Sequence, residues 1–243
     1  EEKMKISEIY RNERTQKLLG LLSLYLVYVL FFKSVSFSSL WGKFFIDKYD
    51  LKSYLMYEIS KRLITLIISV FIICVLFKNK LDLDDSKKMN LIKSILIAIT
   101  VFLLYYFFIA RITIYLQGYL FNSFESPATN IITKLINQVP AYIICVGILA
   151  PIMEELAFRK GLFGFLYELY SGCNEYVRII SSVLISSIVF GAIHNGHFHP
   201  SMIYYSVFGI VCSLLYLYTK RISSPIIIHM MLNLTWAIFT IFG

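Results

Sequence analysis

Long apolar segments alternate with shorter polar ones along this chain of 243 residues. A helix needs about 20 apolar residues to cross the hydrocarbon core of a bilayer, or slightly fewer when charged side chains at its ends reach the membrane surface. The segments that meet this requirement are residues 18–32, 63–77, 91–110, 139–158, 177–193, 201–218 and 225–242. The pattern therefore predicts an all-α fold, a polytopic transmembrane helix bundle of about seven spans, which forms a single integral membrane domain over residues 1–243.

Three longer segments separate the predicted spans. Residues 33–62 mix aromatic residues with lysines, which favours an interfacial helix. Residues 78–90 are a charged loop. Residues 117–138 contain Gly118, Pro127 and several Asn residues, and are typical of a polar connector.

Composition agrees with this pattern. Hydrophobic residues make up 58% of the chain and charged residues 16%, whereas a soluble domain has about 25% charged residues. The net charge of +8 would point to nucleic acid in a soluble protein. Here Lys and Arg gather between the apolar segments, so we interpret them as topology determinants and contacts with anionic membrane lipid, and we expect no nucleic-acid partner.

The distribution of positive charge also predicts the orientation in the membrane. A cytoplasmic N-terminus places fifteen of the 23 Lys and Arg residues on the inner side and eight on the outer side, in line with the positive-inside rule. Residues 1–17 are charged, and the apolar segment after them lacks a small-residue cleavage site. We therefore expect this segment to remain as the first span and not to be removed as a signal peptide.

The four cysteines are Cys74, Cys145, Cys173 and Cys212, and three of them lie inside apolar segments. They form no C-x-x-C pair. We expect small buried hydrophobic residues and not a disulfide framework or a zinc site.

Two adjacent carboxylates, Glu154 and Glu155, interrupt the apolar segment 139–158. A charged side chain at bilayer depth costs about 2.5–3.5 kcal/mol on insertion scales, and it persists mainly where it pairs or does chemistry. Glu155 and Arg159 lie one helical turn apart on one face, which suits an ion pair. Glu154 has no evident counter-charge nearby, and a desolvated carboxylate is a good proton acceptor near neutral pH. A purely structural role, in which the carboxylates clamp helices together, stays equally open.

Two histidines occupy polar helix positions further along the chain. His194 follows Phe190 by four residues, and His229 precedes Asn233 by four. His229 and Asn233 therefore project from the same helix face, and an imidazole beside an amide offers the convergent donors that an oxyanion site requires. The alternative is an interhelical hydrogen-bonded pair of the kind common in membrane bundles.

Simple spans would not bring these residues to one depth. Glu154 and His229 would fall toward the inner side of the membrane, and His194 at the outer end of its span. We expect two adjustments that bring them together. The helix that carries the glutamates would continue through residue 167, and the segment 195–200 would sink into the protein, where irregular backbone can line a watery cavity.

Histidines and carboxylates at these positions are also possible metal ligands. His197 and His199 crowd the segment after His194, but their spacing does not place them on one helical face, so we expect no metal there. Zinc held by Glu154, His194 and His229 is chemically allowed and is kept as a minority possibility, because no His-Glu-x-x-His motif is present. Gly-x-Ser-x-Gly, Gly-x-Gly-Asp and phosphate-binding Gly-x-x-x-x-Gly-Lys-Ser/Thr motifs are also absent from the sequence.

Three clusters carry a resemblance to a known family: Glu154-Glu155-Leu-Ala-Phe-Arg159, Phe190-Gly-Ala-Ile-His194 and His229-Met-Met-Leu-Asn233. They resemble the motifs Glu-Glu-x-x-x-Arg, Phe-x-x-x-His and His-x-x-x-Asn/Asp of the CAAX protease and bacteriocin-processing family, the type II CAAX prenyl endopeptidase-like (Abi) membrane proteins. All three stand in the family's order. The resemblance covers residues 139–243, which would carry the catalytic core.

The resemblance implies an intramembrane endopeptidase of the glutamate type that uses no cofactor. Glu154 would be the general base that activates water, helped by His194. His229 and Asn233 would stabilise the tetrahedral oxyanion. The resemblance thus gives each of the four residues a role in peptide hydrolysis.

In the same resemblance, Glu155 and Arg159 would hold the helix and orient the site. The substrate would be a peptide or a lipidated peptide, cleaved in peptide maturation or bacteriocin immunity at a bacterial cell membrane. Two other functions stay open. A non-catalytic immunity or scaffold protein would bind a peptide or a membrane partner, and a transporter or channel would use a proton-coupled carboxylate, although no inverted repeat supports it.

Overall fold

The computed structural model describes residues 13–32, 51–77, 80–83, 88–122, 127–195 and 199–242. These residues are mostly helical and include no strand. Within them, six helices are long and apolar enough to cross a membrane: Met56–Leu76, Leu91–Phe121, Pro140–Gly172, Glu175–His194, Met202–Thr219 and Ser223–Phe242. The predicted all-α, polytopic helix bundle is confirmed.

Each of the seven predicted spans corresponds to a helix of the structure. The first is α2 (Glu13–Phe32), which is helical as predicted but is not one of the six spans above. The third is longer than predicted, because the helix that begins at Leu91 continues to Phe121. It contains α5 (Leu91–Leu104), the π-helical η3 (Tyr105–Ile109) and α6 (Ala110–Phe121).

The span Pro140–Gly172 is the central helix of the bundle. Of the 18-residue apolar stretch that defines this span, 67% is buried inside the bundle, against 22–39% of the corresponding stretch in the other five spans. It consists of η4 (Pro140–Tyr142), η5 (Cys145–Leu149), α8 (Ala150–Glu155), η6 (Leu156–Phe163), α9 (Gly164–Leu169) and η7 (Tyr170–Gly172). The prediction that the helix of the glutamates continues through residue 167 is confirmed.

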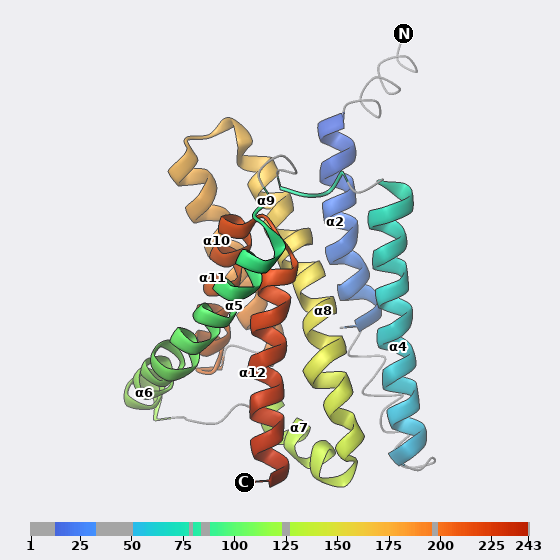
Figure 1. The fold of residues 1–243 in the computed structure, drawn as a ribbon, viewed down its shortest axis with the longest axis vertical. Coiled ribbons are helices and arrows are strands. Elements are labelled where there is room, and N and C mark those ends of the chain that lie inside the picture. Colours follow the sequence, from blue (N-terminus) through green and yellow to red (C-terminus); the bar gives the residue numbers. More distant parts are fainter. Residues whose placement is uncertain are drawn as a thin grey trace.

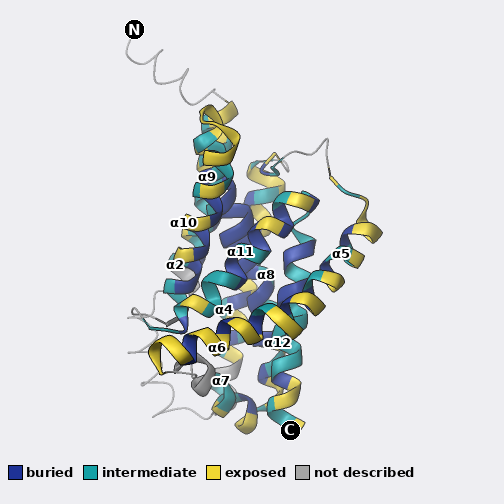
Figure 2. Ribbon diagram, turned by 90° about the vertical axis from the view of Figure 1, so that its left-hand side faces the viewer, coloured by how far each residue is buried: buried dark blue, intermediate teal, exposed yellow. Residues whose placement is uncertain are grey.

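The other helices surround this central one. They are α2, α4 (Leu51–Phe71) with η1 (Ile72–Leu76), α5, α6, α7 (Pro127–Gln138), α10 (Glu175–Asn195), α11 (Met202–Thr219) and α12 (Ser223–Phe242). Figure 1 shows α2 and α4 on one side of α8, and α12 with α5 on the other. Figure 2 shows the buried residues along the middle of the bundle and mostly exposed residues on α6, as expected when outer helix faces contact lipid.

Glycine allows two close helix contacts. A Cβ atom on Gly161 would lie 3.1 Å from the backbone oxygen of Leu21 and the backbone nitrogen of Tyr25 in α2. A Cβ atom on Gly209 would lie 3.0 Å from the Cα of Ser187 in α10. Larger side chains would separate α2 from the central helix and α11 from α10, so small residues set these distances, as is common in membrane bundles.

Two of the predicted connectors contain helix. The interfacial helix expected in 33–62 lies partly outside the described residues. Residues 51–62 are helical, but they are the first turns of α4, and from Met56 onward they belong to a candidate span, so the interfacial position was wrong for residues 56–62. Glu58 pairs with Lys61 and Arg62 at distances of 2.7 and 3.4 Å. These pairs at helical spacing keep the charged turns within the helix.

The polar connector predicted at 117–138 was also wrong for most of its length. α6 ends at Phe121, and its C-cap residue Asn122 has a left-handed φ of 50°. α7 begins at Pro127, a position where proline suits a helix start. Ile136 of α7 is fully buried. The burial of this apolar side chain stabilises the helix, although the polar composition of the segment does not predict one.

The cysteines are only partly as predicted. All four are free thiols; Cys145 and Cys212 are buried, whereas Cys74 and Cys173 are exposed. Cys74 lies beside the outward-facing Val75 in η1, and Cys173 lies in the turn before α10. An apolar neighbourhood in sequence does not distinguish a core position from a lipid-facing one.

Candidate active site

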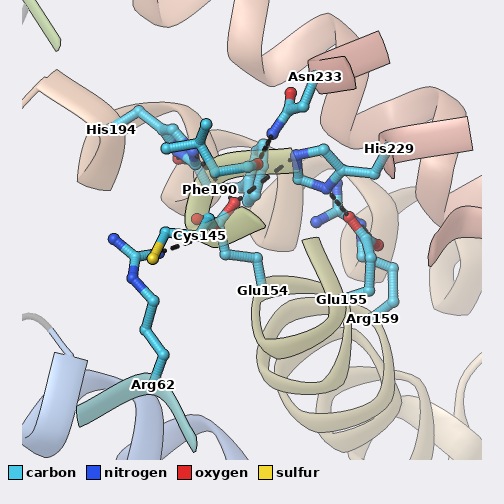
Figure 3. A network of polar contacts seen from close by, with 10 residues as sticks. Arg62, Cys145, Glu154, Glu155, Arg159, Phe190, His194, His229 and Asn233 are labelled. Atoms are coloured by element: carbon cyan, nitrogen blue, oxygen red, sulfur yellow. Dashed lines mark hydrogen bonds and ion pairs between the residues drawn. The ribbon is translucent and has the colours of Figure 1, made fainter. Parts of the chain in front are cut away.

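Three spans of the bundle, the central one with α10 and α12, bring the predicted site residues together, as Figure 3 shows. Glu154 and Glu155 end α8, His194 lies in the last turn of α10, and His229 and Asn233 lie in α12. Figure 1 shows that α10 begins higher along the bundle than α12. The end of α10 therefore reaches the level of the first turns of α12, which resolves the difference in depth that simple spans implied.

Both imidazoles converge on the carboxylate of Glu154. Its Oε2 atom lies 3.4 Å from His194 Nε2 and 3.8 Å from His229 Nε2. Glu154 and His229 are buried, and His194 is half-buried. One water molecule could contact the carboxylate and an imidazole at once across such separations.

Hydrogen bonds on the far side of each ring determine what faces Glu154. His194 Nδ1 lies 2.7 Å from the carbonyl oxygen of Phe190, and because a carbonyl only accepts, this nitrogen carries a proton. His229 Nδ1 lies 2.7 Å from Glu155 Oε1 and donates in the same way. In a neutral ring, Nε2 then presents a lone pair to Glu154. Three acceptors meet here, an arrangement that a donor such as water satisfies.

Aromatic side chains hold the two imidazoles in place. The His194 ring lies between Phe190 and Tyr205, with centroid distances of 4.3 and 4.4 Å. The His229 ring packs edge-on against Phe208 at 4.9 Å. Rings that are packed in this way keep their Nε2 atoms directed at the carboxylate.

Glu155 is fully buried and links two helices. Its Oε2 lies 3.0 Å from Arg159 Nε, so the predicted ion pair is confirmed, and its Oε1 accepts the hydrogen bond from His229. The guanidinium of Arg159 lies 4.2 Å from the centre of the Phe190 ring, a cation–π contact. The bond to His229 was not predicted, because local spacing does not show which of two adjacent carboxylates faces α12.

Asn233 shares a helix face with His229, as predicted, but its amide contacts the backbone. Nδ2 donates to the carbonyl oxygen of Val146 at 2.8 Å. His229 instead directs Nε2 at Glu154. The two side chains thus lie at the same site while holding different partners.

The Val146 carbonyl is available because of the local sequence. The helix is π-helical over η5, where the N–H of Ala150 donates to the carbonyl of Cys145. The next residue, Pro151, has no N–H. Val146 therefore lacks both backbone donors that a helix would offer its carbonyl, and Asn233 supplies one from α12. Single π turns of this kind often occur at functional sites.

Two buried residues of the N-terminal half contact the central helix near the site and were not predicted. Arg62 of α4 is 6% exposed and Tyr28 of α2 is 2% exposed. Arg62 donates to the carbonyl of Cys145, and the Tyr28 ring packs edge-on against Phe158. The signal in the sequence was the helical spacing of Glu58 and Arg62 directly before the apolar segment 63–77. Residues 33–62 were expected to form an interfacial helix instead.

In the described part of the chain, no group of three or more His, Cys, Asp or Glu side chains is placed to hold a metal ion. His199 Nδ1 lies 2.8 Å from the hydroxyl of Ser201. His197 lies outside the described residues, as do residues 196 and 198 of the segment 195–200 whose burial was predicted; His199 and Pro200 are half-buried. The expectation that no cofactor is used stays a prediction.

Comparison with known families locates these residues in one domain. Residues 136–235 match the family model described as type II CAAX prenyl endopeptidase Rce1-like. The matched residues, fewer than half of the chain, are thus similar to this family. They run from the end of α7 into α12 and include all six predicted site residues, so the resemblance drawn from the three motifs is confirmed. α2 and α4, which supply Tyr28 and Arg62, lie outside the matched range.

Two curated membrane proteins are similar to part of the chain. The membrane-embedded CAAX protease MroQ of Staphylococcus aureus (strain USA300) is 38% identical over 108 residues, which are 44% of this chain and 42% of MroQ. YdiL of Bacillus subtilis (strain 168), named as a candidate membrane peptidase, is 39% identical over 109 residues, 45% of this chain and 41% of YdiL. The similarity thus covers well under half of each relative's length. No solved structure matches the chain.

Proposed function

We propose that this chain is an intramembrane endopeptidase in which a water molecule, activated by Glu154 and His194, hydrolyses a peptide bond. One observation carries the proposal: the Nε2 atoms of His194 and His229 both lie within 4 Å of Glu154 Oε2. A carboxylate and an imidazole that share a water form a general-base arrangement suited to hydrolysis. The relatives named as membrane peptidases support the same class of reaction.

In the proposed reaction, the water oxygen attacks the carbonyl carbon of the substrate. Glu154 takes a proton from the water as the new C–O bond forms, and the carbonyl oxygen becomes an oxyanion. His194 orients the water through Nε2, since its Nδ1 is held by the carbonyl of Phe190. The proton then passes from Glu154 to the leaving nitrogen as the C–N bond breaks, which gives a carboxyl group and an amine.

His229 and Asn233 are the proposed oxyanion donors. A protonated His229 donates from both nitrogens, and Glu155, which accepts from Nδ1, stabilises that charge. Asn233 Nδ2 carries two hydrogens; one binds Val146, and the second is a donor for a substrate oxygen. Loss of one such donor typically lowers kcat about 10²–10³-fold. This route involves neither a covalent intermediate nor a metal.

We further propose a peptide or lipidated peptide as substrate and a bacterial cell membrane as the location, with the N-terminus of the chain in the cytoplasm. The position of the site among membrane-spanning helices supports a substrate that reaches the bilayer. Basic side chains gather at the end of the bundle where α2 begins, namely Arg14, Lys17, Lys88, Lys160, Arg178 and Arg221. This distribution agrees with the positive-inside rule. Peptide maturation or bacteriocin immunity is the proposed process.

The test is cleavage of candidate peptides by the purified chain in detergent, with and without a chelator. We expect cleavage to persist in chelator, and to be abolished in Glu154→Ala and His229→Ala although both variants remain folded. Loss of cleavage in chelator, with recovery on added zinc, would replace the proposed mechanism by a metal-dependent one. Unchanged cleavage in either variant would remove that residue from the mechanism, and a parent chain that binds but does not cleave would indicate a scaffold.

A further inference from the structure

A cluster of charges on α4 lies outside the residues that match the Rce1-like family model and packs against the helix that carries Glu154. It consists of Glu58, Lys61 and Arg62. Glu58 and Arg62 are only 5% and 6% exposed, and α4 contacts α8 and η5. Buried ions within a membrane span are costly and persist mainly where they pair or take part in function.

Glu58 is the shared partner of the two cations in this cluster. Lys61 Nζ lies 2.7 Å from Glu58 Oε1, and Arg62 Nη2 lies 3.4 Å from Glu58 Oε2. These pairs hold the guanidinium of Arg62 on the buried face of α4. Arg62 also interacts electrostatically with Glu154, the carboxylate that faces the two imidazoles.

Arg62 also contacts the backbone that positions Glu154. Its Nη1 donates to the carbonyl of Cys145 and its Nη2 to the hydroxyl of Tyr142, both in long hydrogen bonds of 3.5 Å. The carbonyl of the next residue, Val146, accepts from Asn233. Two consecutive carbonyls of the π turn are thus held by side chains from α4 and α12, as Figure 3 shows in part.

This turn directly precedes α8. A change in the turn would rotate α8 and move the carboxylate at its end relative to the imidazoles. A displacement of about 1 Å at a reacting group can cost about 10²-fold in rate. The contacts of Arg62 therefore bear on catalysis without requiring it to touch a substrate.

We propose that Arg62 is a positioning residue of the active site, contributed by the N-terminal half of the chain. Together with Asn233 it holds the π turn in η5, and it thereby couples α4 to the carboxylate of Glu154. The kinetic part of this proposal rests on the proposed peptidase function. Its structural part, the coupling between Arg62 and Glu154, does not.

The kinetic test compares Arg62→Met and Arg62→Lys with the parent, and uses Arg111→Met as a matched control. Arg111 lies on an exposed face of α6, 6.0 Å from the ring of Tyr106. We expect Arg62→Met to lower kcat about 10- to 100-fold, with KM changed less than about twofold. Arg62→Lys should recover part of the lost kcat because it keeps the charge. Arg111→Met should behave as the parent. An unchanged kcat, a loss confined to KM, or no recovery in Arg62→Lys would overturn the proposal.

A thermal double-mutant cycle separates this proposal from the peptidase function. Melting temperatures are measured in detergent for the parent, Arg62→Met, Glu154→Gln and the double variant. We expect Arg62→Met to lower the melting temperature more in the parent than in the Glu154→Gln background, because the two charges interact. Equal shifts in both backgrounds would overturn the proposal even if the parent cleaves peptides. A positive cycle in a chain that cleaves nothing would leave the positioning contact intact and reject the peptidase function alone.

Discussion

Glu154 and Glu155 are neighbours in sequence but have different surroundings in the bundle. Successive residues on a helix point about 100° apart, so each carboxylate meets a different set of side chains. Glu154 faces the two imidazole Nε2 atoms. Glu155 is enclosed by Arg159 and His229. These surroundings favour a chemical role for Glu154 and a structural role for Glu155.

Substitution of these two residues should therefore have unlike effects on stability. Glu155→Gln removes the charge that Arg159 and His229 share, and breaking a buried ion pair in this way costs about 3–5 kcal/mol. We expect a clearly lower melting temperature for Glu155→Gln than for Glu154→Gln. Glu168→Gln on α9 is the matched control, with an expected change of about 0–1 kcal/mol because its ion pairs lie near the surface. A parent-like melting temperature for Glu155→Gln would contradict the structural role.

At the scale of the element, the central helix departs from regular α geometry on both sides of the glutamates. η5 precedes α8, and η6 follows it. Pro151 within α8 prevents the first π turn from being satisfied by backbone bonds alone, since proline has no N–H. The helix therefore depends on Asn233 of α12 for a hydrogen bond to the carbonyl of Val146. Arg62 of α4 adds a second hydrogen bond to the carbonyl of Cys145, which also accepts from Ala150.

Pro151→Ala tests whether this irregular turn matters. The new N–H would donate to the carbonyl of Gly147, four residues earlier, and relax the turn toward α-helix, which would shift Glu154. We expect cleavage to fall about tenfold or more. The melting temperature should stay at or above that of the parent, because alanine favours a helix interior over proline by about 3 kcal/mol. Parent-like cleavage by a folded Pro151→Ala variant would show that the turn does not position the carboxylate.

At the scale of the whole molecule, the sequence alone predicted what depends on local spacing. The apolar segments gave the helices, and the spacing of Glu155 and Arg159 gave their ion pair. The contacts of Glu155 with His229 and of Arg62 with Cys145 join distant parts of the chain. They depend on which helices pack against α8, which a single sequence does not show.

The orientation in the membrane can be tested with Cys173. This exposed thiol lies in the turn before α10, at the end of the bundle where Arg14 of α2 contacts the carbonyl of Leu169. A cytoplasmic N-terminus predicts that a membrane-impermeant maleimide labels the chain in inside-out vesicles and not in intact cells. Because Cys74 is also exposed, the experiment uses a Cys74→Ser background, in which Cys173→Ser should abolish the labelling. Labelling from the outside of intact cells would contradict the proposed orientation.

The proposed mechanism depends above all on Glu154 as the base that activates water. The most direct measurement is the peptide cleavage rate of purified Glu154→Gln in excess chelator, beside the parent and Glu168→Gln. Gln keeps the size of the side chain but cannot take a proton from water. The mechanism predicts a rate lower by about 10²–10⁴-fold for Glu154→Gln and a parent-like rate for Glu168→Gln. Cleavage by folded Glu154→Gln at the parent's rate would contradict it.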